Sequence, residues 1–148
     1  VLNMSVRENI ASNIVTVISG ITSPAVKKVS RQPFPIDELS QQQYPAVLVQ
    51  TIEETKEDQE LGSGARTRLA TLEFAVTGYV KTNEDNIDTA RNNLAGAIET
   101  ELESDITRGS NALDTEVVSI ETDAGSLYPY GAVLMTIRVT YEHQSATP

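Results

Sequence analysis

The chain contains no cysteine, no tryptophan and a single histidine, His143. Without cysteine there is no disulfide, no thiolate metal ligand and no cysteine nucleophile. One histidine cannot build the histidine and cysteine cluster of a zinc site, and no Gly-x-Ser-x-Gly turn is present to position a serine nucleophile. We therefore expect no catalytic residue, no metal site and no cofactor, and we interpret His143 as an exposed residue at a strand end.

Carboxylates are abundant, so their number alone does not exclude a hydrolase that uses two acidic residues. Such glycosidases hold two acids across a sugar-binding cleft, and no tryptophan is available to line one. The acidic run from Glu57 to Glu60 lacks the alternating aspartates and glycine of a calcium loop. The Gly62–Gly64 segment lacks the Lys-Ser/Thr pair of a phosphate-binding loop. We interpret the first as a solvated charge run and the second as a flexible pivot.

Long apolar runs are also missing. None approaches the roughly 20 residues that a membrane-spanning helix needs, and the N-terminus shows no charged region followed by an apolar stretch. We expect neither a signal peptide nor a membrane partner. The 148 residues suit a single domain, residues 1–148. The net charge of −10 argues against stable nucleic-acid binding, because binding to phosphates requires cationic groups that displace counterions.

Two segments repeat apolar residues at helical spacing. Ser5 and Glu8 have the spacing of a capping box in front of the first segment, which predicts a helix over Val6–Ile21. Asn83 is placed to cap a second helix that starts at Glu84 and runs to residue 102. Gly96 lies inside this second helix, where we expect it to allow close approach to a strand.

Alternating apolar residues predict four strands. They cover Tyr44–Ile52, Arg68–Val80, Thr115–Glu121 and Ala132–His143. The proline-containing segment Ala25–Phe34 is expected to be extended, as a connector or an edge strand. The order of elements is helix, strand, strand, helix, strand, strand, which predicts an α+β two-layer sandwich with mainly antiparallel strands.

The first two predicted strands are separated by 15 polar residues, Glu53–Thr67. A hairpin turn usually takes two to five residues, so we expect this segment to be a projecting arm kept for a protein partner. Its acids and cations are nearly balanced, which suits ion pairing with another protein. The predicted interface residues are Glu53, Glu54, Lys56, Glu57, Asp58, Glu60, Arg66 and Arg68.

Most of the negative charge lies in residues 84–105, where seven acids and one arginine give a net charge of −6. The last turns of the predicted helix hold Glu99, Glu101, Glu103 and Asp105, although the helix dipole disfavours anions there. Glu101 projects toward the apolar side of the helix. Either the last turn leaves the core and Glu101 is solvated, or Glu101 pairs with a cation of a neighbouring subunit.

The order of elements, with a long charged segment between the first two strands, resembles the tail terminator proteins of long-tailed bacteriophages. The resemblance spans both predicted helices, all four predicted strands and the arm, and leaves only residues 25–43 unplaced. It implies a structural virion protein without enzymatic activity. It also implies a homohexameric ring that caps the tail tube, stops its polymerisation and attaches it to the head, after assembly in the bacterial host cytoplasm.

The same resemblance implies the partners. One ring surface is expected to dock the tail tube protein and the other a neck or connector protein, while DNA passes through the ring without stable binding. Glu99, Glu101, Glu103 and Asp105 are the expected acidic wall of the lumen. Two alternatives stay open: a head–tail connector or neck protein of a phage, and a small α+β protein-binding module unconnected with phages.

Overall fold

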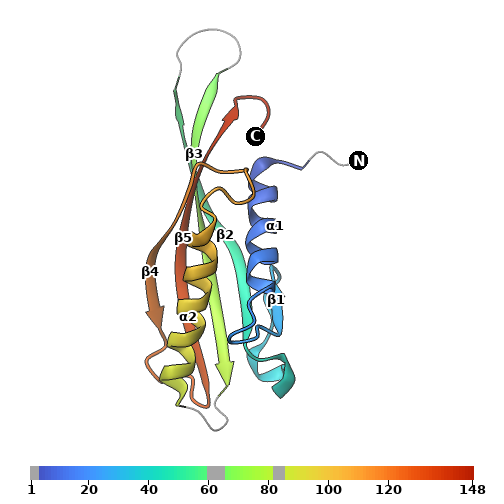
Figure 1. Cartoon of the computed structure of the whole chain (residues 1–148), viewed down its shortest axis with the longest axis vertical. Coiled ribbons are helices and arrows are strands. Elements are labelled where there is room, and N and C mark those ends of the chain that lie inside the picture. The colour runs from blue at the N-terminus through green and yellow to red at the C-terminus, as the bar shows by residue number, and fades with distance from the viewer. Residues whose placement is uncertain (1–3, 60–65, 82–85) are drawn as a thin grey trace.

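The computed structural model describes residues 4–59, 66–81 and 86–148. Helices α1 (Val6–Ser19) and α2 (Ile87–Ser104) lie on one face of a five-stranded sheet (Figure 1). The strands are β1 (Lys28–Ser30), β2 (Ala46–Asp58), β3 (Thr67–Lys81), β4 (Asp114–Thr122) and β5 (Tyr130–Gln144). The predicted α+β two-layer sandwich is confirmed.

The sheet has the order β1-β2-β3-β5-β4. Neighbouring strands are antiparallel throughout, except that β1 runs parallel to β2 over three residue pairs. The extended segment Ala25–Phe34 thus contributes a short edge strand, and residues 36–43 form two single 3₁₀ turns before β2. Neither described helix is long and apolar enough to cross a membrane.

The hydrophobic core lies between the two helices and the inward face of the sheet. Alternate residues of the two central strands supply the sheet side, as their sequences predict, and each helix supplies one apolar stripe. Burying each such side chain contributes roughly 1.5–3 kcal/mol. The fully buried residues include Ile10, Ile14, Ile18, Leu72, Phe74, Val76, Leu94, Ile98, Leu102, Met135, Ile137 and Val139.

A side-chain cap starts α1, but only half of the predicted capping box forms. Ser5 Oγ accepts a hydrogen bond from the Glu8 amide at 3.3 Å. The Glu8 carboxylate does not reach back to the cap and instead pairs with the Arg31 guanidinium, beyond β1. This ion pair connects the first turn of α1 to the segment that leaves the edge of the sheet.

Helix α2 begins later than its sequence pattern predicts. Its first residue is Ile87, and Asn86 Oδ1 caps it by accepting from the Asp88 amide at 2.9 Å. The predicted start at Glu84 is therefore wrong, and the predicted cap Asn83 lies outside the described residues. Asn86 has the same capping chemistry three positions further on, which a single sequence does not distinguish.

A buried cation closes the other end of α2. The Arg108 side chain is fully buried and donates to the carbonyl oxygens of Leu102 and Asp105, which the helix leaves without partners. Its charge also offsets the unfavourable position of the acidic last turn at the negative end of the helix dipole. Arg108 itself adopts a left-handed backbone conformation, with φ of 49°.

The hairpin of β2 and β3 is longer than predicted. After a bulge between Thr51 and Glu53, β2 continues to Asp58, which pairs with Arg68. The prediction of a 15-residue loop is therefore wrong, because only residues 59–66 separate the two strands. Residues 60–65 lie outside the described residues. No apolar alternation marks the added strand residues, because the inward-facing positions are occupied by polar residues, Glu54 and Lys56.

Gly96, within α2, and Gly78, on β3, differ in how closely other atoms pack around them. A Cβ added at Gly96 would meet no atom within 4 Å, so the prediction that Gly96 allows close approach to a strand is wrong. A Cβ added at Gly78, on β3, would lie 2.6 Å from Leu94 Cδ2 and 3.2 Å from Val133 Cγ1. The close approach of helix and sheet therefore depends on Gly78.

Replacing each glycine with alanine is expected to have effects of opposite sign. Gly96→Ala removes the helix-interior penalty of glycine and should raise the free energy of unfolding by about 0.5–1 kcal/mol. Gly78→Ala should lower it by about 1–3 kcal/mol, because Leu94 has to move. Urea unfolding of the two variants checks this, and equal effects would contradict the packing described here.

Candidate protein-contact site

The sheet extends past the helices as a ribbon, which we call the arm. It consists of residues 53–58 of β2, residues 67–73 of β3 and residues 140–144 of β5. Figure 1 shows β2 and β3 continuing beyond the N-terminal end of α1, with the end of β5 beside them. The arm thus contains three paired strands at its base rather than an isolated loop.

A carboxylate joins the arm to α1. Glu54 accepts from Arg7 Nη2 at 2.8 Å and from the Tyr141 hydroxyl, and Lys56 Nζ lies 3.6 Å from the same carboxylate. The Glu54 side chain is only 14% exposed. Its partners come from a helix and from two strands, so the cluster fixes the direction in which the arm leaves the domain.

These contacts shift the pKa values of Glu54 and Tyr141. Burial alone would raise the pKa of the Glu54 carboxyl, but the hydrogen bonds from Tyr141 and Arg7 outweigh it and hold that pKa below its usual range. Burial and the adjacent Glu54 carboxylate raise the pKa of Tyr141 to about 12. At neutral pH the carboxylate is therefore charged and the phenol donates to it.

His143 belongs to the same arm and is buried, so its interpretation as an exposed strand end is wrong. It is 6% exposed, and its Nε2 lies 2.9 Å from Lys56 Nζ. An ammonium has no acceptor, so Nε2 accepts and Nδ1 donates to the Gln144 carbonyl oxygen at 2.7 Å. The histidine serves as a structural link between β2 and β5.

The outer part of the arm is held by ion pairs within the chain. Asp58 lies 2.8 Å from Arg68 Nε and 3.2 Å from Arg66 Nη1. Among the described residues, Glu53 and Glu57 have no cation of this chain as a partner. Glu60 lies outside the described residues. The structure thus brings together five of the predicted interface residues: Glu54, Lys56, Asp58, Arg66 and Arg68. Their contact with another protein stays a prediction.

A row of charges crosses the face of the sheet opposite the helices. Register aligns Glu53, Glu73, Arg138 and Glu116 on four adjacent strands. Arg138 lies 3.4 Å from Glu73 and 3.2 Å from Glu116, so one guanidinium bridges two carboxylates. Sequence spacing cannot reveal such a row, because it depends on the register of three strand pairs.

The acidic end of α2 divides between two sides of the helix. Glu103 accepts from the Val117 amide of β4 at 3.0 Å, whereas Glu101 borders a groove on the other side, toward the end of α1. Asp105 accepts from the Thr107 hydroxyl and from the Thr107 and Gly109 amides, and these bonds lower its pKa. Glu99 is half-buried. The four acids predicted to share one surface are thus spread around the helix.

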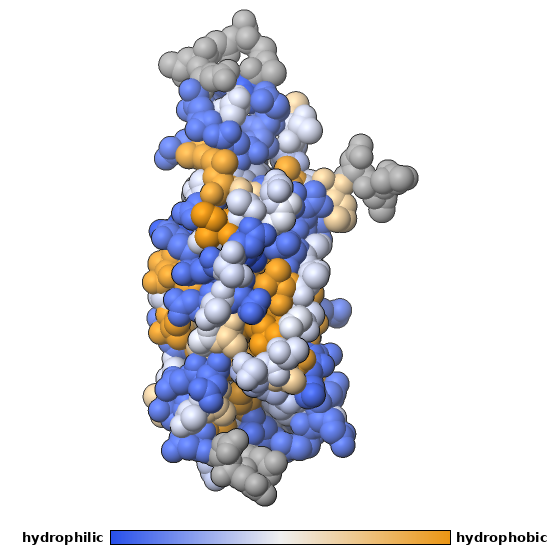
Figure 2. All heavy atoms as spheres, viewed as in Figure 1, coloured by the Kyte–Doolittle hydropathy of each residue, from blue (hydrophilic) through white to orange (hydrophobic). Residues whose placement is uncertain are grey.

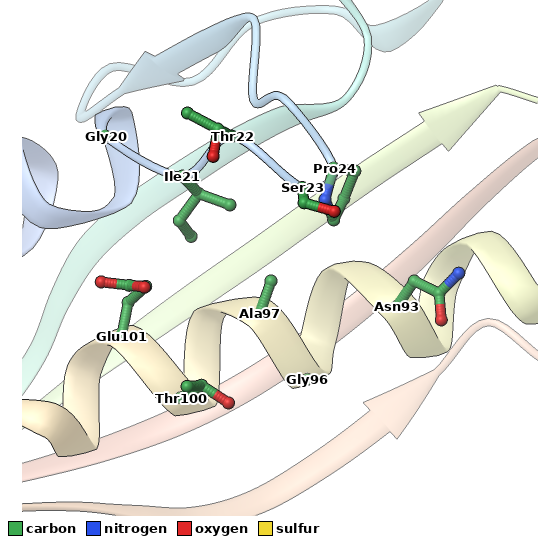
Figure 3. Close-up of a pocket in the computed structure, with 10 residues that line it drawn as sticks. All are labelled: Gly20, Ile21, Thr22, Ser23, Pro24, Asn93, Gly96, Ala97, Thr100 and Glu101. Atoms are coloured by element: carbon green, nitrogen blue, oxygen red, sulfur yellow. The ribbon is translucent and has the colours of Figure 1, made fainter.

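The groove beside Glu101 lies between the turn after α1 and the exposed side of α2. Figure 3 shows the Gly20–Pro24 turn facing Asn93, Gly96, Ala97, Thr100 and Glu101 across it. Its volume is about 650 Å³. Glu101 is exposed there with no cation of the described chain as a partner, so its two interpretations, solvation or pairing with a cation of a neighbouring subunit, both stay predictions.

The described residues place no group of three or more histidine, aspartate or glutamate side chains where a metal ion could be held. What they present is a ribbon of strands braced by internal ion pairs, an uncovered sheet face and a shallow groove. These features define a small α+β domain with one sheet face and one strand ribbon exposed.

The sequence pattern of the family described as "Bacteriophage Tail Tube Terminator Protein" matches residues 4–147. The chain belongs to this family, and it is a structural component of a phage tail rather than an enzyme. Comparison with curated protein sequences gives no match.

Among solved structures, a chain from the "Virion of native gene transfer agent (GTA) particle" is similar, with a TM-score of 0.51 and 13% identity. The similarity covers 94% of this chain and 92% of that chain. At this identity the similarity shows a shared fold. The predicted resemblance to tail terminators is confirmed by the family match.

The Glu54 cluster predicts a stability that depends on pH. Because its folded-state pKa lies below the unfolded value, the contribution of Glu54 is complete above about pH 5 and is lost as the pH falls through the lowered pKa. Glu54→Gln should cost about 1–3 kcal/mol at neutral pH and weaken the acid dependence. Urea unfolding at several pH values measures both, with Glu57→Gln as the exposed control on the same strand. Identical pH profiles for Glu54→Gln and the parent chain would contradict the cluster.

Proposed function

We propose that copies of this chain form a closed ring that caps the tail tube, stops its polymerisation and offers the head-attachment surface at the head-proximal end of the tail. The observation that carries the proposal is the match of the terminator family to nearly the whole chain. The braced arm supports it, since a rigid projection is suited to reach a neighbouring molecule. The ring is expected to be a homohexamer.

Within this proposal the arm makes the protein contacts. Five of its charged residues pair with one another or with neighbouring strands, which reduces the ordering cost when the arm binds. Glu53 and Glu57 remain available to cations of a tail tube protein or of a neighbouring copy. Closed head-to-tail contacts of this kind generate a ring of fixed size.

The lumen is the path of the DNA in this proposal. An acidic wall repels phosphates and so limits adhesion during passage. The acids at the end of α2 supply part of that wall, since residues 84–105 carry a net charge of −6. Assembly takes place in the bacterial host cytoplasm, with a neck or connector protein joining later.

A head–tail connector or neck protein is the second candidate, because it would also enter a virion and close a ring. The two differ in what they bind first. A terminator stops the growth of tail tubes in the absence of heads, whereas a neck protein leaves tube length unchanged and binds DNA-filled heads.

Shortening the arm is expected to abolish capping while the domain still folds. Lys56 pairs with Ala70 in register, so residues 57–69 are replaced by Asn-Gly, a two-residue hairpin turn. The core and the Glu54 cluster remain, so urea unfolding should stay cooperative. Light scattering should then show a loss of rings, and electron microscopy should show tail tubes of uncontrolled length.

The matched control keeps the outer charges of the arm. Asp58 pairs with Arg68 in register, so Asn-Gly replaces residues 59–67 only. We expect this variant to retain more capping than the shorter one. Normal rings and normal tube lengths in both variants would refute the role proposed for the arm.

The parent chain is expected to show no measurable binding to duplex DNA at physiological salt. Changing Glu99 and Glu101 to lysine should make assembled rings retain DNA, because the wall then attracts phosphates. Changing Asp37 and Glu38, which are exposed in a 3₁₀ turn before β2, to lysine adds the same charge away from α2 and the arm and serves as the control. Gel-shift assays on rings check this, and micromolar binding by the parent chain would contradict a repulsive lumen.

A further inference from the structure

The five-stranded sheet ends in two open edges. On one side, none of the other described strands pairs with the outer edge of β4, residues 114–122. On the other side, β1 pairs with β2 only at Ala46–Leu48. On that edge, no described strand pairs with residues 50–58 of β2. One amide of the β4 edge, that of Val117, already donates to Glu103 of α2, and the remaining edge amides and carbonyls form a template for another strand.

Both open edges also expose large apolar side chains. On β4, Val118 and Ile120 are each 43% exposed, and Figure 2 shows hydrophobic surface gathered along the side of the molecule where β4 lies. On β2, Ile52 is 61% exposed. The surrounding positions on both strands are largely polar, so these side chains are the apolar contacts that each edge offers.

Two of these exposed residues, Ile52 and Val118, are produced by bulges that flank one row of the sheet. Ile52 is the extra residue between Thr51 and Glu53, and Val118 is the extra residue between Val117 and Ser119. One row of paired residues crosses the sheet beside both bulges: Thr51, Phe74, Ile137 and Val117. Ile52 lies on the side of this row toward the end of the arm and Val118 on the other side, so they project from opposite edges about one residue, roughly 3.4 Å, apart along the strands.

The directions of the two edge strands are compatible with pairing. The sequence β2-β3-β5-β4 is antiparallel at every step, so β4 runs opposite to β2. Two copies placed side by side in the same orientation would thus bring β4 of one antiparallel to β2 of the next. In this unshifted register Ile52 and Val118 lie on adjacent strands with an offset of about one residue, which leaves their side chains within contact distance.

We propose that a second copy of this chain occupies each edge: β4 of one copy packs along residues 50–58 of β2 in the next, with Ile52 seated against Val118 and Ile120. The inference rests on the proposed ring and specifies which surfaces close it. The contact is heterologous, because the two edges differ, and it repeats around the ring.

The size of this contact explains why it favours a closed ring over a dimer. Nine strand residues span about 30 Å, and a seam about 10 Å wide buries about 300 Å² per copy. The total of about 600 Å² lies below the roughly 1,200 Å² of a stable pair. In a closed ring each copy uses both edges at once, so we expect monomers and rings with few dimers between them.

Charge opposes the contact at one position. In the row that crosses the uncovered face, Glu116 of one copy would lie beside Glu53 of the next, and Arg138 already pairs with Glu116. Added salt screens this repulsion without weakening the apolar contact. Assembly should therefore become stronger as ionic strength rises, unlike an interface held by ion pairs.

Cross-linking tests the seam directly, since the chain has no cysteine of its own. Ile52→Cys and Val118→Cys are made in one chain. Within a copy the two positions are separated by three strand spacings, about 14 Å, which is too far for a disulfide. A cross-link must therefore join two copies, and mild oxidation should give a ladder of oligomers in a denaturing gel without reductant.

The chains with a single cysteine serve as controls for the cross-linking experiment. A mixture of Ile52→Cys and Val118→Cys chains should stop at dimers, and either variant alone should give none. Dimers from one variant alone would mean a symmetric contact and overturn the proposal. Rings seen by light scattering without any cross-link would overturn the seam and leave the ring intact, whereas no oligomer at any salt concentration would refute both.

A second measurement does not depend on oxidation. Ile52→Lys should lower the fraction of rings at least tenfold, because an ammonium replaces the apolar anchor. Leu134→Lys, at an exposed apolar residue of β5, which has a strand on both sides, is the control and should leave assembly unchanged. Equal assembly of the two variants, with unchanged unfolding curves, would overturn the seam.

Discussion

Packing of both helices against the same face of the sheet is the constraint on which the other features of this domain depend. It places the apolar residues of β3 and β5 in one core and leaves the opposite face, the two edges and the arm in contact with solvent. A sheet covered on both faces would have no surface left for a charge row or for a long ribbon.

The arm stays rigid because its charges are satisfied locally. Glu54 binds a helix residue and a strand tyrosine, and Asp58 binds two arginines of the hairpin. Ion pairs of this kind contribute more to a defined direction than to the free energy of folding. The charged residues of the hairpin thus determine its shape, and only a minority of them remain free for a partner.

The fold was largely predictable because apolar residues recur in its helices and central strands with a regular period. The buried residues of β5 alternate without exception from Val133 to Tyr141, and the helices have single apolar stripes. The extension of β2 to Asp58 was not predictable, because its inward-facing residues, Glu54 and Lys56, are polar and give no apolar period. The burial of His143 and the division of the acids of α2 depend on register and rotation, which spacing alone does not determine.

The shortness of β1 has a consequence for the neighbouring edge of β2. Its pairing with β2 ends at Ser30, where the chain bends and Arg31 turns toward Glu8 on α1. A single ion pair therefore marks where the protected part of the sheet stops. Covering residues 49–58 of β2 would take an extension of β1 of similar length, so the length of one short edge strand decides how much of the β2 edge stays open.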